Sequence, residues 1–120
     1  MYCEKVINEF ENPFHMYAHE SSTHLIKHVG GGCGDEAYVY LIVEDDLIKE
    51  VSFEVFGCAS CLALTSFLCR CIENKRSLDL TELNYVYFKR EFSELEPSQN
   101  HCIDLVCALV ENIREVLNST

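Results

Sequence analysis

The fold is decided by residues 38–60, YVYLIVEDDLIKEVSFEVFGCAS, which contain two apolar segments on either side of a short acidic stretch. Both segments are rich in β-branched and aromatic residues, and the second alternates apolar with polar side chains, as a half-buried strand does. Glu44-Asp45-Asp46 supplies a turn, so we expect an antiparallel hairpin. Because the open ends of a hairpin lie side by side, this one carries Cys33 and Cys58 to the same edge of the sheet.

One further strand and four helices are predicted around the hairpin. Helices are indicated where apolar residues recur at three- and four-residue steps, and the last helix begins after the break at Pro97. The predicted elements are a helix over 2–10, a loop over 14–23, a strand over 24–29, hairpin strands over 38–43 and 48–56, and helices over 59–73, 80–92 and 102–117. We therefore predict one domain over residues 1–120, of the α+β class, with a small antiparallel three-stranded sheet and helices packed on one face.

Composition restricts the partners, the cellular compartment and the state of the cysteines that we expect. The 120 residues carry a formal net charge of −11, which argues against a nucleic-acid partner because such binding depends on Lys and Arg. No apolar run has the length of a signal peptide or of a membrane span, so we expect a cytoplasmic protein without a membrane partner. In a reducing compartment, the eight cysteines favour free thiols or metal ligands over disulfides.

Three widely separated cysteines have neighbours that suit a metal or sulfur site: Cys33 in GGCGD, Cys58 in FGCAS, and Cys102 directly after His101. Each lies at a predicted loop or element end, where a thiol can be ionised and reached. Cys58 and Cys102 each begin a predicted helix, whose dipole favours thiolate over thiol. Cys33 lies in a glycine-rich loop whose amides can face an anionic cluster.

A carboxylate and an imidazole lie beside these thiols in the sequence. Asp35 follows Cys33 by two residues and His101 precedes Cys102, so the predicted site combines three thiolates with one harder ligand. A carboxylate ligand exchanges more readily than a thiolate, which suits a metal cluster that must leave.

The remaining cysteines and histidines give weaker signals. Cys61 forms a C-x-x-C pair with Cys58, but no second pair has matching spacing, so we interpret it as an accessory ligand at best. Inside predicted helices, three cysteines are interpreted as small buried hydrophobes: Cys69, Cys71 and Cys107. Cys3 is treated as incidental, and four histidines are interpreted as surface or structural residues: His15, His19, His24 and His28.

With these residues identified, the chain resembles the iron-sulfur cluster assembly scaffold family of the IscU and NifU N-terminal type. Its opening, YCEKVINEFENP at residues 2–13, is similar to the N-terminal signature of that family. Three motifs then follow in the family's order and near its spacing: Cys33-Gly34-Asp35, Phe56-Gly57-Cys58 and His101-Cys102. The resemblance covers nearly the whole chain and implies a SufE/NifU-like fold.

The resemblance implies a scaffold rather than an enzyme, one that builds a transient 2Fe-2S cluster from iron and sulfide or persulfide sulfur. In the family pattern Cys33, Cys58 and Cys102 are the cluster thiolates, and Asp35 and His101 are alternative fourth ligands. Cys102 is the acceptor of persulfide sulfur from a cysteine desulfurase, and the same side chains hold zinc in the cluster-free form. The implied partners also include ferredoxin-like electron donors, frataxin-like iron donors and acceptor apo-proteins; the sequence leaves a homodimer open.

Two segments depart from the family pattern. The chaperone-recognition motif LPPVK is represented by Leu95-Glu96-Pro97-Ser98-Gln99, so the lysine is missing and weak or no chaperone binding is implied. The small and hydroxyl residues that usually follow the second cysteine are replaced by Cys61-Leu62-Ala63-Leu64, which changes the polarity expected for the cluster pocket.

Two other functions remain open at this point. One is a sulfurtransferase in which zinc, held by Cys33, Asp35 and Cys58, positions Cys102 to relay persulfide sulfur. The other is a structural zinc domain without sulfur chemistry, which chelation would unfold.

Overall fold

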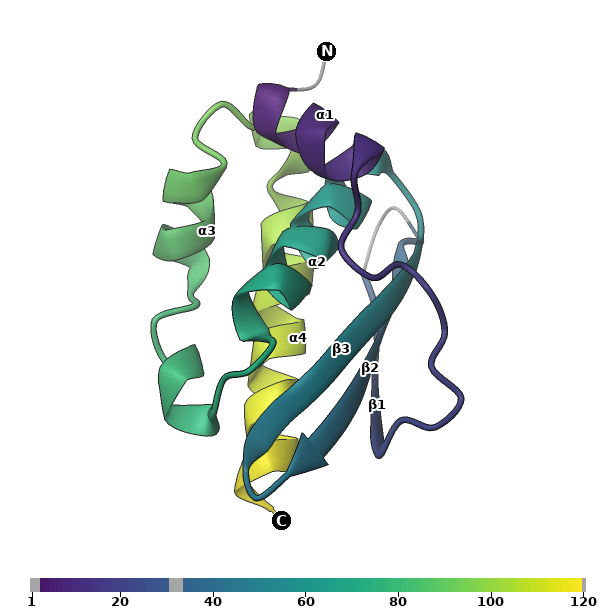
Figure 1. Cartoon of the computed structure of the whole chain (residues 1–120). Coiled ribbons are helices and arrows are strands. Elements are labelled where there is room, and N and C mark those ends of the chain that lie inside the picture. The colour runs from purple at the N-terminus through teal and green to yellow at the C-terminus, as the bar shows by residue number, and fades with distance from the viewer. Residues whose placement is uncertain (1–2, 31–33, 120) are drawn as a thin grey trace.

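A three-stranded antiparallel sheet packs against helices in the computed structural model, which describes residues 3–30 and 34–119 (Figure 1). The elements are α1 (Glu4–Glu11), β1 (His24–Val29), β2 (Glu36–Glu44), β3 (Leu47–Phe56), α2 (Ala59–Ile72), η1 (Ser77–Leu80), α3 (Tyr85–Glu91), η2 (Pro97–Gln99) and α4 (His101–Asn118). This arrangement confirms the predicted α+β class and the three predicted strands.

The sheet has the strand order β1-β2-β3, with both neighbouring pairs antiparallel. The two turn residues Asp45 and Asp46 have positive φ angles of 51° and 65°, as a tight two-residue hairpin loop requires. Across the three strands, Val39 pairs with Ile26 on one side and with Phe53 on the other, and all three side chains are buried. This row forms part of the face on which the helices pack.

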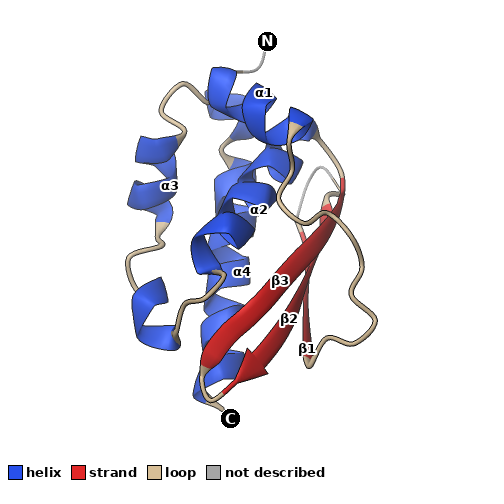
Figure 2. Cartoon of the chain, viewed as in Figure 1, coloured by secondary structure: helices blue, strands red, loops and turns tan. Residues whose placement is uncertain are grey.

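Helices α2 and α4 lie against one face of the sheet, while α1 packs on α2 and α3 packs on α4 (Figure 2). The three- and four-residue steps in the sequence predict one buried face on α2, and four of its five residues are buried: Thr65, Ser66, Cys69 and Ile72, but not Leu62. Ala63, Leu64, Phe67 and Leu68 are buried as well. The helix is buried on several sides because it has α1, β3 and α4 as neighbours. It is the central helix of the domain, and its first turn is held firmly in place.

The predicted helix over 80–92 is wrong in its first half. The structure instead has the short 3-10 helix η1 and then α3, which begins only at Tyr85. The side-chain oxygen of Asn84 accepts a hydrogen bond from the backbone N–H of Tyr87 at 2.9 Å. Asn84 is therefore an N-cap that starts a new helix, and a residue of this kind favours a cap over a helix interior.

The hairpin register decides what lies beside Cys58. Glu36, the first residue of β2, pairs with Phe56, the last residue of β3. Asp35 and Cys58 consequently lie next to each other at the same edge of the sheet. Cys33, for which the same position is predicted, lies outside the described residues.

Replacing Leu109 with alanine tests the packing of α4. Leu109 has no exposed surface, so Leu109→Ala removes buried methyl groups and leaves a cavity. We expect the free energy of unfolding to fall by about 2–5 kcal/mol, measured by denaturant titration. The matched control is Leu78→Ala, because Leu78 is 82% exposed; it should change the free energy by less than about 0.5 kcal/mol. Equal effects of the two substitutions would contradict the packing described.

Candidate functional site

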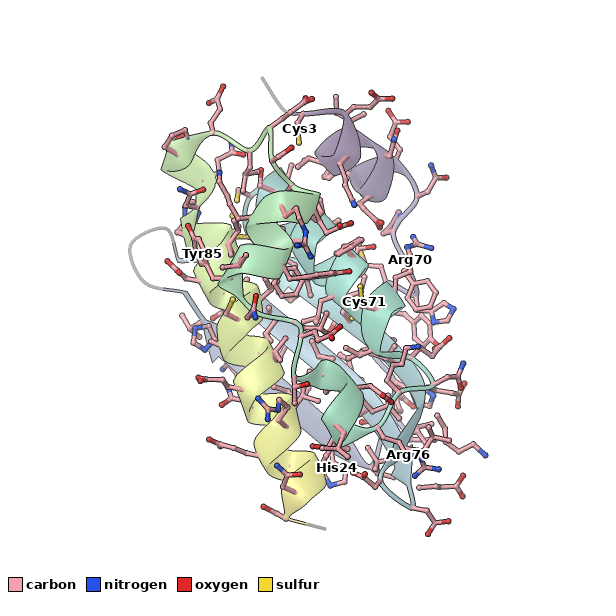
Figure 3. The ribbon with its side chains drawn as sticks, turned by 90° about the vertical axis from the view of Figure 1, so that its left-hand side faces the viewer. Cys3, His24, Arg70, Cys71, Arg76 and Tyr85 are labelled. Atoms are coloured by element: carbon pink, nitrogen blue, oxygen red, sulfur yellow. The ribbon has the colours of Figure 1, made fainter. Side chains whose placement is uncertain are left out.

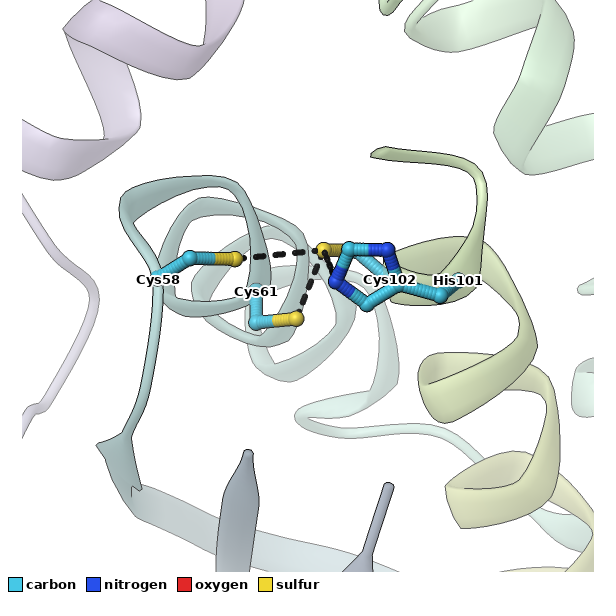
Figure 4. Close-up of side chains that lie close together, drawn as sticks. All are labelled: Cys58, Cys61, His101 and Cys102. Atoms are coloured by element: carbon cyan, nitrogen blue, oxygen red, sulfur yellow. Dashed lines mark hydrogen bonds between the residues drawn. The ribbon is translucent and has the colours of Figure 1, made fainter. Parts of the chain in front are cut away.

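Four side chains that offer sulfur or nitrogen atoms meet where α2 and α4 begin. Cys58 is the N-cap residue of α2 and Cys61 lies in its first turn, while His101 and Cys102 are the first two residues of α4. One ligand atom from each of the four lies within 4.8 Å of all the others. Figure 4 shows that the three sulfur atoms point toward one another, with the imidazole ring beside Cys102.

Cys102 is at the centre of this group. Its Sγ atom lies 2.6 Å from the Sγ of Cys61, 3.5 Å from the Sγ of Cys58 and 3.5 Å from Nε2 of His101. Cys61 and Cys102 have no exposed surface, whereas Cys58 and His101 are half-buried. The group is therefore a thiol cluster with its two inner members shielded from solvent.

The carboxylate of Asp35 lies against this thiol cluster and is only 2% exposed. Its Oδ1 atom accepts a hydrogen bond from the backbone N–H of Cys58 at 2.9 Å. Its Oδ2 atom lies 3.4 Å from the Cys61 sulfur and 3.4 Å from Nε2 of His101. Asp35 thus connects the start of β2 with the first turns of both helices.

Gly57 makes this close approach of Asp35 possible. A Cβ atom built on Gly57 would lie 1.9 Å from Oδ1 of Asp35, which no side chain can tolerate. Gly57 is therefore needed because its missing side chain leaves room for the Asp35 carboxylate, and not because the backbone adopts a positive φ angle.

Hydrogen bonding within the cluster decides which thiol ionises most readily. The hydrogen bond donated by Cys61 is the main cause that lowers the pKa of Cys102 below its ordinary value, against the opposing effect of burial. The same hydrogen bond, followed by burial, raises the pKa of Cys61 well above its ordinary value. Cys102 is accordingly the more readily ionised thiol of the pair.

For Cys58, burial outweighs the effect of the helix start that the sequence leads us to expect. Burial is the main cause that raises the pKa of this thiol, and the nearby Cys102 adds to it, although the backbone N–H of Cys61 acts in the opposite direction. For Cys102 the lowered pKa agrees with the expectation, but its main cause is the thiol of Cys61.

The structure brings together four of the residues predicted from the sequence: Asp35, Cys58, His101 and Cys102. Cys61 was underestimated, because it contacts Cys102 more closely than Cys58 does. The sequence feature that indicates a role for Cys61 is its spacing of three residues from Cys58, because residues three apart lie on the same face of a helix.

The other predicted hydrophobic cysteines lie apart from the thiol cluster. Cys69 is fully buried, and burial raises its pKa well above the ordinary value. Cys71 lies toward the end of α2, where its sulfur is 3.8 Å from the hydroxyl oxygen of Tyr87, and Cys3 lies at the start of α1 (Figure 3). Burial also raises the pKa of Cys107, to about 11.

The segment 95–99, which stands in place of the chaperone-recognition motif, contacts the start of α2 beside the site. The hydroxyl group of Ser60, in the first turn of α2, donates a hydrogen bond to the side-chain oxygen of Gln99. Leu95 is 5% exposed and belongs to the core. Nζ of Lys89 donates to the backbone oxygen of Leu95 and to Oδ1 of Asn100, each at 3.2 Å. Leu95, Gln99 and Asn100 thus hold this segment against the protein, while Glu96, Pro97 and Ser98 between them are exposed.

A cavity of about 260 Å³ borders the thiol cluster on the sheet side. Its lining includes His28, Asp35, His101 and Asp104. Because His101 belongs to the thiol cluster and Asp35 lies against it, this cavity reaches the edge of the site. His28, interpreted above as a surface or structural residue, lies in its wall.

The donor set determines what the site can hold. Thiolate and imidazole are the usual ligands of zinc and of iron in iron-sulfur clusters, and four such atoms suffice for tetrahedral coordination. Fold and site together define a small α+β domain that presents clustered thiols at the starts of two helices.

Comparison with known proteins identifies the family of this domain. The family model for the NifU-like N terminal domain matches residues 1–113, so the chain belongs to that family. It is 31% identical over 106 residues to the iron-sulfur cluster assembly scaffold protein IscU of Aquifex aeolicus, covering 87% of this chain and 68% of the relative. It is 32% identical over 107 residues to iron sulfur cluster assembly protein 1 of Trachipleistophora hominis, covering 84% of this chain and 75% of the relative.

A solved structure supports the fold independently. The N-terminal part of a NifU-like protein from Brucella abortus superposes with a TM-score of 0.64, covering 95% of this chain and 78% of the other, at 16% sequence identity. Among the helices in the described residues, none combines the length and apolar character needed to span a membrane.

Substituting Gly57 tests the role of Asp35. In Gly57→Ala the new methyl group displaces the carboxylate and breaks its hydrogen bond to Cys58, so we expect a loss of about 1–3 kcal/mol in stability. Zinc affinity, measured by competition with a chromophoric chelator, should fall roughly 10–100-fold, as when a residue that supports metal ligands is disturbed.

Gly30→Ala is the matched control for this substitution. A Cβ atom at Gly30 meets its nearest neighbour at 3.5 Å, an ordinary contact. Its effect on stability should stay below about 1 kcal/mol in either direction. Wild-type stability and zinc affinity in Gly57→Ala would contradict the assigned role of Asp35.

Proposed function

We propose that this chain is a scaffold on which an iron-sulfur cluster is assembled and from which the cluster passes to acceptor apo-proteins. The observation that carries the proposal is the convergence of Cys58, Cys61, His101 and Cys102 within 4.8 Å, beside the buried carboxylate of Asp35. The names of the two curated relatives, which describe cluster assembly, support it.

The cluster is the cargo of this site, and we propose a 2Fe-2S cluster held by Cys58 and Cys102. Cys33, which lies outside the described residues, is the third thiolate in the set predicted from the sequence. His101 and Asp35 compete for the fourth position. Since Oδ1 of Asp35 is engaged by the backbone of Cys58, its Oδ2 atom is the one that faces the cluster ligands. A carboxylate or imidazole at this position gives a weaker bond than a thiolate, so the cluster can leave.

Sulfur enters through Cys102. Its lowered pKa makes it the nucleophile that takes sulfur from the persulfide of a cysteine desulfurase. Cys102 has no exposed surface, so the transfer requires a local rearrangement that uncovers its sulfur atom. Ferredoxin-like electron donors and frataxin-like iron donors are proposed to act at the same site.

The same donors fit zinc, which takes four nitrogen or sulfur ligands in tetrahedral geometry. Zinc would therefore occupy the site when iron is absent and protect its thiolates. A zinc-dependent sulfurtransferase that relays sulfur through Cys102 is the alternative, and it makes no cluster.

Cluster assembly can be tested by anaerobic reconstitution with ferrous iron, L-cysteine and a cysteine desulfurase. The wild-type protein should develop the visible absorption of a 2Fe-2S centre, and Cys58→Ser and Cys102→Ser should lose most of it, because each removes a thiolate ligand. The sequence predicts the same result for Cys33→Ser.

Cys69→Ser is the matched control, since Cys69 is a buried α2 cysteine outside the thiol cluster; it should keep the wild-type absorption. A wild-type protein that stays colourless while Cys102 becomes persulfidated would contradict the scaffold function and favour the sulfurtransferase function.

A further inference from the structure

Cys61 and Cys102 form the closest thiol pair of the cluster. Their sulfur atoms are 2.6 Å apart, and neither residue has any exposed surface. Cys61 is absent from the ligand set that the family resemblance implies, and its thiol faces both the sulfur acceptor and the Asp35 carboxylate. Two thiols in such contact, one of which accepts sulfur, are arranged for thiol exchange.

We propose that Cys61 is a resolving thiol, which releases the sulfur of a Cys102 persulfide as sulfide inside the assembly site. The proposal rests on the proposed function, because the scaffold role supplies the persulfide on Cys102. It adds a reductive step that this chain performs with its own side chains.

The step balances as a thiol–persulfide exchange. The sulfur of Cys61 attacks the inner sulfur of the persulfide, the Sγ atom of Cys102, and forms a Cys61–Cys102 disulfide. The bond between the inner and outer persulfide sulfurs breaks, and the outer sulfur leaves as hydrosulfide with the electron pair of that bond. The proton of Cys61 passes to Asp35 and then to the hydrosulfide, so one persulfide and one thiol yield one disulfide and one H₂S. The sulfur of Cys61 is oxidised, the outer sulfur is reduced to sulfide, and the oxidation level of the Cys102 sulfur does not change in this step.

Geometry favours Cys61 over Cys58 for this attack. The sulfur of Cys58 is 3.5 Å from Cys102, against 2.6 Å for Cys61. Oδ2 of Asp35 lies 3.4 Å from the Cys61 sulfur, so the proton of Cys61 has an acceptor once Cys102 carries the persulfide. Cys58 is half-buried and is a proposed cluster ligand, so a Cys58–Cys102 disulfide would occupy two of the cluster thiolates, whereas a Cys61–Cys102 disulfide occupies one.

The released sulfide appears next to Cys58 and His101, where iron is to be bound. The disulfide is then reopened by an external dithiol, which is oxidised to its own disulfide and returns Cys61 and Cys102 to thiols. This reductant requires the same local rearrangement as the transfer from the desulfurase, because Cys61 and Cys102 have no exposed surface.

The experiment is a single turnover without iron or added reductant, using catalytic cysteine desulfurase and one equivalent of L-cysteine per scaffold. The wild-type protein should lose the mass of two hydrogen atoms and show a Cys61–Cys102 disulfide by peptide mapping. About one equivalent of free sulfide should be trapped with bromobimane, as the exchange stoichiometry requires.

In the same experiment, Cys61→Ser should gain the mass of one sulfur atom on Cys102 and release no sulfide. Cys69→Ser, which removes another fully buried α2 thiol, should behave as wild type. The disulfide map of the wild type needs no variant, so the result stands even if Cys61→Ser folds poorly.

A wild-type protein that retains its persulfide, keeps its starting mass, or forms a Cys58–Cys102 disulfide would overturn the resolving role. Reconstitution with ferrous iron and sodium sulfide, which bypasses the persulfide, tests the scaffold separately. If the cluster forms from sodium sulfide while the single-turnover experiment leaves a stable persulfide on Cys102, only the Cys61 step is refuted. If no cluster forms from sodium sulfide, the scaffold function is refuted.

Discussion

The contact between the Asp35 carboxylate and the backbone N–H of Cys58 is the interaction on which the site depends. A carboxylate that is 2% exposed is costly unless its oxygens are satisfied, and here both have partners from other elements. Oδ1 accepts from Cys58, while Oδ2 faces Cys61 and His101. One side chain thereby fixes the start of α2 and meets the start of α4.

This anchoring explains the unusual chemistry of the thiols. When two helices begin at one point, their first turns crowd cysteines together, and one thiol must donate a hydrogen bond to another. Cys61 donates and Cys102 accepts, so the pKa of Cys102 is lowered although the residue is buried. We propose that Cys61, which lowers the pKa of Cys102, is also the group that reacts with Cys102 once Cys102 has taken up sulfur. Sulfur acceptance, cluster binding and sulfide release are therefore proposed for a single group of side chains.

Local patterns predicted most of the fold, because strand alternation, the acidic turn and helical periodicity depend on neighbouring residues. The hairpin register then follows, and with it the proximity of Asp35 and Cys58. The prediction of a single helix over 80–92 is wrong in its first half because Asn84 caps a new helix there. Cys61 was underestimated for a different reason: its spacing from Cys58 shows a shared helix face, but only the packing of α4 against α2 shows that this face meets Cys102.

The central claim is that cysteines distant in the sequence converge as ligands of one site. X-ray absorption spectroscopy at the zinc edge, on the zinc-loaded full chain, tests it directly. The account predicts at least two sulfur ligands at about 2.3 Å from zinc, and one fewer in Cys102→Ser. A zinc shell of only nitrogen and oxygen atoms, or one unchanged in Cys102→Ser, would contradict it.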